Sequence, residues 1–117
     1  MTREQARLAY PGWLRALAGG AGDDARVAAG EALLGYASQV ARSRLQNAVP
    51  GMPAAELAAT VRDFSWALAR HEAIHGEKLP DRFEGFEALL AAILHECWLR
   101  RGGADHDDHA QIPDPRA

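Results

Sequence analysis

The sequence is poor in cysteine and has no long hydrophobic run. Its one cysteine, Cys97, excludes an internal disulfide and is typical of a reducing compartment, so we expect a cytoplasmic protein. The first residues lack the basic and then apolar layout of a signal peptide. No apolar run approaches the ~20 residues that a membrane-spanning helix needs. We therefore expect neither export nor a membrane partner.

Signals for β-strands are also scarce. No run of four or more Val, Ile, Thr or Tyr residues occurs, and aromatic residues make up only 7% of the chain. Alanine, the strongest helix former, is abundant instead, with 25 of the 117 residues. A chain of this length with 48% hydrophobic residues supports one core. The composition therefore predicts a single all-α domain.

Charge divides the chain into a neutral body and an acidic end. Residues 102–117 carry four aspartates against Arg116, a net charge of -3, whereas residues 1–101 carry 12 basic and 12 acidic residues. We predict a helical domain over residues 1–101 and a flexible acidic tail over residues 102–117. A neutral body disfavours a general nucleic-acid binder, which usually shows a basic excess. Arg42 and Arg44 are the candidate contacts if the chain belongs to a nucleoprotein complex.

Residues 53–76 contain the clearest long helix. Pro53 suits the first helical turn, and Gly76 can adopt the left-handed conformation that ends a helix. One face carries a stripe with spacings of four and three residues, made by Leu57, Val61, Phe64, Leu68, His71 and His75. This face is predicted to pack on the core.

Two further long helices flank this one. The first is predicted to begin after an N-cap at Asp23 or Asp24 and to run to about residue 47. The second should run over residues 82–101, with Asp81 as its cap and Cys97 as a buried structural thiol. The three helices have similar predicted lengths of roughly 20–24 residues, about 30–36 Å, and short connections. This pattern favours an antiparallel bundle of three long helices.

The N-terminal segment, residues 1–18, is predicted to be a short helical arm in two pieces. Thr2 and Gln5 have the spacing of a capping box, which favours a helix start. Pro11 and Gly12 disfavour helix at the residue before them. We therefore expect a broken arm that packs on the main body or on another subunit.

The end of the 53–76 helix reads H-E-x-x-H, from His71 to His75. In zinc hydrolases this spacing places two imidazoles on one face to bind the metal, and the glutamate next to the first histidine activates a metal-bound water. Glu72 would be that catalytic base. Glu87, at the edge of the apolar stripe of the last helix, is the candidate third ligand.

The string HEAIHG, residues 71–76, resembles the HEAGHA string of the FtsH-type zinc peptidases over about six residues. This resemblance implies a zinc site at His71 and His75. In that family an acidic third ligand lies far downstream, beyond the length of this chain. We favour the alternative in which both histidines are structural, are hydrogen-bonded near a helix end, and hold no cofactor.

Trp66 lies on the opposite side of the same helix from Leu57, Phe64 and Leu68. Arg62, Arg70 and several alanines surround it, which is a composition typical of a protein-binding hot spot. The alternative is that the N-terminal arm covers Trp66 with Trp13 and Leu17. If the arm does so, Trp66 belongs to a second layer of the core.

These patterns favour a small cytoplasmic helical module that binds a protein partner or itself, as an adapter, an inhibitor or a small subunit of an assembly. A metal-dependent hydrolase that uses residues 71–75 is the main alternative, and enzymatic activity is the less favoured outcome. A subunit of a nucleoprotein complex is a further alternative.

Overall fold

The computed structural model describes residues 1–19, 22–71 and 78–101, and the regular structure in these ranges is entirely α-helical. The four described helices are α1 (Arg3–Leu17), α2 (Asp23–Ala48), α3 (Ala54–Ala69) and α5 (Phe83–Arg100). No helix within these ranges combines the length and the apolar character needed to cross a membrane. The predicted tail, residues 102–117, lies outside the described residues.

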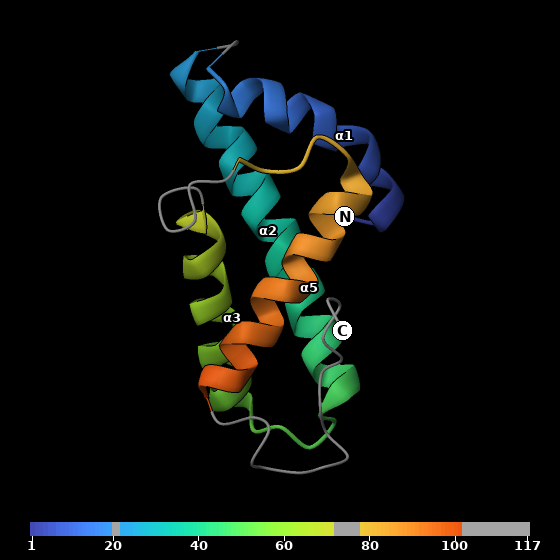
Figure 1. Ribbon diagram of the computed structural model, residues 1–117, viewed down its shortest axis with the longest axis vertical. Helices are drawn as coiled ribbons and strands as arrows, with labels where there is room; N and C mark the ends of the chain where they lie inside the picture. Colours follow the sequence, from blue (N-terminus) through green and yellow to red (C-terminus); the bar gives the residue numbers. More distant parts are fainter. Residues whose placement is uncertain (20–21, 72–77, 102–117) are drawn as a thin grey trace.

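Helix α2 is the element on which the others pack (Figure 1). Helix α3 returns beside it in the opposite direction, and α5 crosses to contact both. Helix α1 packs against α2, and just before α1 begins the Met1 carbonyl accepts a hydrogen bond of 2.8 Å from the Gln39 side-chain amide in the second half of α2. The helices differ in length, with 26 residues in α2, 16 in α3 and 18 in α5, whereas similar lengths were expected.

The N-terminal helix is continuous, so the predicted break at Pro11 is wrong. Thr2 and Gln5 form the expected reciprocal capping box, and the helix then runs through Pro11 to Leu17. A proline inside a helix costs about 3 kcal/mol. Tyr10 and Trp13, on either side of it, are both buried, and burial of each contributes about 1.5–3 kcal/mol. Tertiary packing therefore outweighs the local cost.

Several predicted helix ends also differ from the structure. Helix α2 begins after Gly22, whose φ of 92° favours glycine, and no side chain caps it. Asp23 therefore lies in the first turn, where its charge interacts favourably with the helix dipole. Helix α5 begins after Arg82 and not after a cap at Asp81. Helix α3 ends at Ala69, earlier than the predicted residue 76, with no glycine or proline to mark that end.

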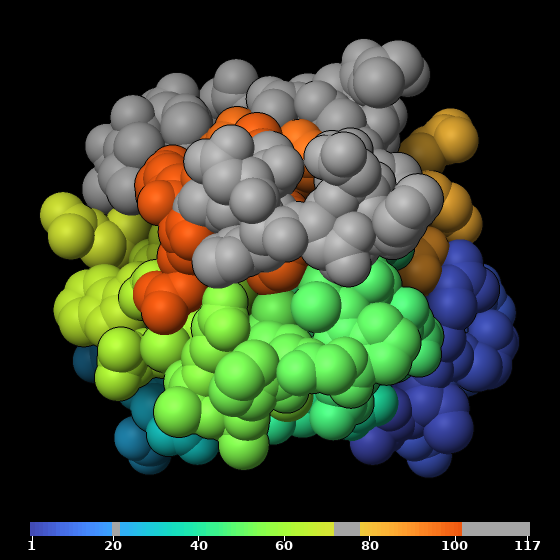
Figure 2. All heavy atoms as spheres, turned by 90° about the horizontal axis from the view of Figure 1, so that it is seen from below, coloured from blue at the N-terminus to red at the C-terminus, as the bar shows by residue number. Residues whose placement is uncertain are grey.

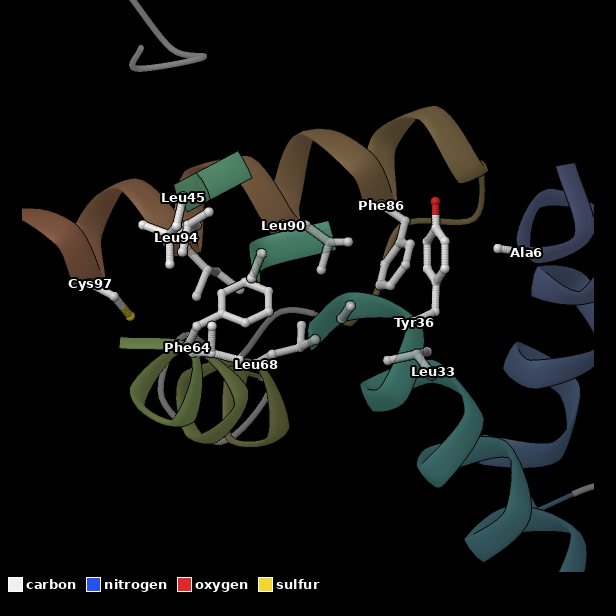
Figure 3. Close-up of a cluster of buried hydrophobic side chains, with 14 of the residues drawn as sticks. Ala6, Leu33, Tyr36, Leu45, Phe64, Leu68, Phe86, Leu90, Leu94 and Cys97 are labelled. Atoms are coloured by element: carbon white, nitrogen blue, oxygen red, sulfur yellow. The ribbon is translucent and has the colours of Figure 1, made fainter. Parts of the chain in front are cut away.

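The core lies between α2, α3 and α5, and their side chains point toward one another in Figure 3. Phe64 of α3 and Phe86 of α5 are fully buried, as is Leu45 near the end of α2. Cys97 is buried as predicted, and burial raises the pKa of its thiol. The expected apolar stripe of α3 is confirmed, with Leu57, Val61, Phe64 and Leu68 all in the core.

A cluster of aromatic rings joins α1 to the other helices. Tyr10 stacks on Phe86, with ring centroids 4.7 Å apart, and its hydroxyl donates a hydrogen bond to the Pro80 carbonyl at 2.5 Å. Trp13 lies beside Tyr36 of α2, with the two ring centroids 6.5 Å apart. The guanidinium of Arg3 lies 5.5 Å from the Phe83 ring and binds both carboxylate oxygens of Glu87. The aromatic rings of α1 therefore pack against α2 and α5.

Candidate functional site

Trp66 is the one aromatic side chain of the chain that faces outward. The other seven aromatic residues, all in the described ranges, are at most 8% exposed, whereas Trp66 is 63% exposed. A chain with so few aromatic residues uses nearly all of them in its core. An exposed tryptophan is therefore the feature of this surface that most needs an explanation.

The helical repeat and two side-chain contacts determine where Trp66 points. Ser65, the preceding residue, shares a hydrogen bond of 2.8 Å with Ser38 of α2. Asp63 accepts a hydrogen bond of 2.8 Å from Arg101, which directly follows α5. These contacts hold the two flanks of α3 against neighbouring segments while Phe64 is fully buried. Trp66, two residues after Phe64, is left on the opposite side of the helix.

The N-terminal helix does not cover Trp66. Trp13, which was the candidate cover, is buried next to Tyr10 and Tyr36. The first turns of α1 and the whole of α3 lie on opposite sides of the molecule in Figures 1 and 2. The alternative in which the arm makes Trp66 part of a second core layer is therefore wrong.

The surface around Trp66 is positively charged. Arg62 and Arg70 lie four residues before and after Trp66, and both are exposed. The only carboxylate between residues 60 and 70 is that of Asp63, which Arg101 neutralises. We call Trp66, Arg62 and Arg70, with the exposed Ala69, the Trp66 face.

The structure leaves the H-E-x-x-H prediction untested, because Glu72 and His75 lie outside the described residues. His71 is buried, and it follows the end of α3 at Ala69. Both carboxylate oxygens of Glu87, the proposed third ligand, accept hydrogen bonds of 2.7 Å from Arg3. Within residues 1–19, 22–71 and 78–101, no three His, Cys, Asp or Glu side chains are grouped to hold a metal ion.

The sequence reasoning missed a groove between α1, α2 and the end of α3. It has a volume of about 660 Å³, and leucines such as Leu14, Leu34 and Leu68 line it. His71, Lys78 and Asp81 contribute its polar groups. Four separate segments build this groove: α1, α2, the end of α3 and residues 78–81. No local pattern in the sequence could therefore indicate it.

Arg42 and Arg44 are both exposed on α2. Residues two apart on a helix point in different directions, so these two side chains do not form one patch by themselves. Their role in nucleic-acid binding stays a prediction.

Comparison with known proteins gave no match, because no family model, curated protein or solved structure is significantly similar to the chain.

Proposed function

We propose that this protein is a small cytoplasmic interaction module, an antiparallel helical bundle that binds a protein partner through the Trp66 face. Its role would be that of an adapter, an inhibitor or a small subunit of a larger assembly. The observation that supports this proposal is the 63% exposure of Trp66 in a chain whose other aromatic residues are all in the core.

The area that Trp66 leaves in water is large enough to supply much of the binding free energy. A tryptophan side chain buries up to about 250 Å², so an exposed fraction of 63% leaves roughly 160 Å² open. At about 25 cal/mol per Å², covering this area would contribute up to about 4 kcal/mol. Interface tryptophans that act as hot spots typically contribute 2 kcal/mol or more. This one residue could therefore dominate a binding surface.

The surroundings of Trp66 also suit an interface. Arginine, like tryptophan, is enriched at protein interfaces. The exposed Ala69 beside it would let a partner approach the helix closely. The side chain is also carried on a regular helix whose opposite face is fixed in the core, so little conformational entropy needs to be lost on binding.

The test is to identify the protein that co-purifies with the chain from its native cells and to reconstitute the complex from purified components. Trp66→Ala should weaken the reconstituted complex by at least about 30-fold, which corresponds to the 2 kcal/mol of a hot spot. Leu8→Ala is the matched control, because Leu8 is 68% exposed on a different helix. Equal affinities for the wild type and Trp66→Ala would refute the proposal.

A further inference from the structure

The charges on the Trp66 face carry an inference about the partner, which rests on the proposed function. We infer that this face binds an acidic, helical protein segment with one apolar side chain between two carboxylates. The apolar side chain would cover Trp66, and the carboxylates would pair with Arg62 and Arg70.

The spacing of the two arginines defines the partner. Arg62 lies on α3, and Arg70 directly follows the last residue of that helix. The two are eight residues apart, which at 1.5 Å per residue is about 12 Å along the helix axis. Trp66 lies midway between them. A partner helix with a carboxylate four residues before and four residues after a central apolar residue has the same spacing on one face. Arginine side chains pair well with carboxylates because the guanidinium can donate two parallel hydrogen bonds.

Both arginines are available for such contacts. Neither forms an ion pair with another residue in the described part of the chain, and both are exposed. Asp63, the one carboxylate in the sequence between residues 60 and 70, is held by Arg101 at 2.8 Å. The face therefore has a local charge of about +2 on a body of zero net charge, and this local field favours an acidic partner.

A second copy of the chain fits this face poorly. A twofold-symmetric contact uses the same patch on both subunits. It would bring two copies of Arg62 and two of Arg70 around the paired tryptophans, with each Asp63 already neutralised by Arg101. Like charges facing each other in an interface oppose association.

Nucleic acid also fits less well than an acidic protein. Tight binding to a nucleic-acid backbone uses about six to ten phosphate contacts. The Trp66 face offers two arginines, and residues 1–101 carry as many acidic as basic residues. A short acidic segment needs only the two arginines and the tryptophan.

The experiment uses the full chain and three probes. The first is a capped helical peptide with a central leucine and a glutamate four residues before and after it. The second has lysines in place of these glutamates, and the third is a short oligothymidylate. Because Trp13 and Trp98 are buried and Trp66 is exposed, protection of tryptophan fluorescence from acrylamide quenching reports occupation of the Trp66 face.

The glutamate peptide should protect Trp66 saturably, and the double variant Arg62→Glu/Arg70→Glu should bind it at least tenfold more weakly. The double variant Arg42→Glu/Arg44→Glu is the matched control, because it changes the net charge of the protein by the same amount but at a site on α2. It should bind the glutamate peptide like the wild type. Equal or tighter binding of the lysine peptide or of the oligothymidylate would overturn the inference. A Trp66-dependent dimer in sedimentation, or no protection by the glutamate peptide, would also overturn it.

Binding of the native partner by two variants distinguishes this inference from the proposed function. Loss of that partner in Trp66→Ala but not in Arg62→Glu/Arg70→Glu would overturn the acidic-segment inference and leave the interaction surface in place. Retention of the partner in both variants would overturn both.

Discussion

The burial of the Tyr10 phenol should make the stability of the protein depend on pH in the alkaline range. The Tyr10 hydroxyl donates to the Pro80 carbonyl at 2.5 Å, and its ring stacks on Phe86. Burial, together with the nearby charge of Asp81, raises the pKa of Tyr10 from 10.0 to about 12. The folded state therefore holds the proton of this phenol more tightly than the unfolded chain does.

The sign and size of the effect follow from this difference. The stabilisation is fully present below pH 10 and is lost as the pH rises from about 10 to about 12. The free energy of unfolding should fall by about 1.4 kcal/mol per pH unit inside this window, and by about 1.4 kcal/mol in total between pH 9 and pH 11. At neutral pH, Tyr10→Phe should cost about 1–2 kcal/mol, because the Pro80 carbonyl loses its donor.

The assay is urea denaturation of the wild type and Tyr10→Phe at pH 7, 9, 10 and 11, followed by far-UV circular dichroism. The stability difference between the two proteins should be constant up to pH 9 and should shrink by about 1.4 kcal/mol at pH 11. Burial also raises the pKa of Tyr36, so Tyr36→Phe shows how much of the wild-type loss comes from that residue. A difference that stays constant from pH 7 to pH 11 would refute the assignment to Tyr10.

Two further predictions compare matched pairs of substitutions by the same denaturation assay. Gly85→Ala should destabilise the protein, because the new Cβ would lie 2.9 Å from the Pro80 Cβ. Gly35→Ala has nothing within 4 Å of its Cβ and should stabilise α2 by about 0.5–1 kcal/mol; equal effects of the two substitutions would contradict this account. Phe64→Ala should cost about 3–5 kcal/mol because Phe64 is fully buried. Trp66→Ala should change stability by at most about 0.5 kcal/mol, and a large loss would mean that Trp66 supports the fold.

The sequence predicted the helical class and most of the core face of α3 because these depend on local periodicity. Spacings of three and four residues identified Phe64 and Leu68 as core positions, and the structure confirms both. The same reasoning failed at Pro11, where local propensity predicts a break. Packing of Tyr10 and Trp13 against other helices is a long-range effect, and no pattern within the segment encodes it.

The candidate site shows the same division between local and long-range effects. The sequence by itself placed Trp66 opposite the core face of its helix, between Arg62 and Arg70, because the helical repeat determines which residues share a side. It left open whether another segment covers that side. The tertiary structure decided this, since Trp13 packs against Tyr36 and leaves Trp66 exposed. Periodicity determines the direction of a side chain, but only the packing of distant segments determines whether anything lies over it.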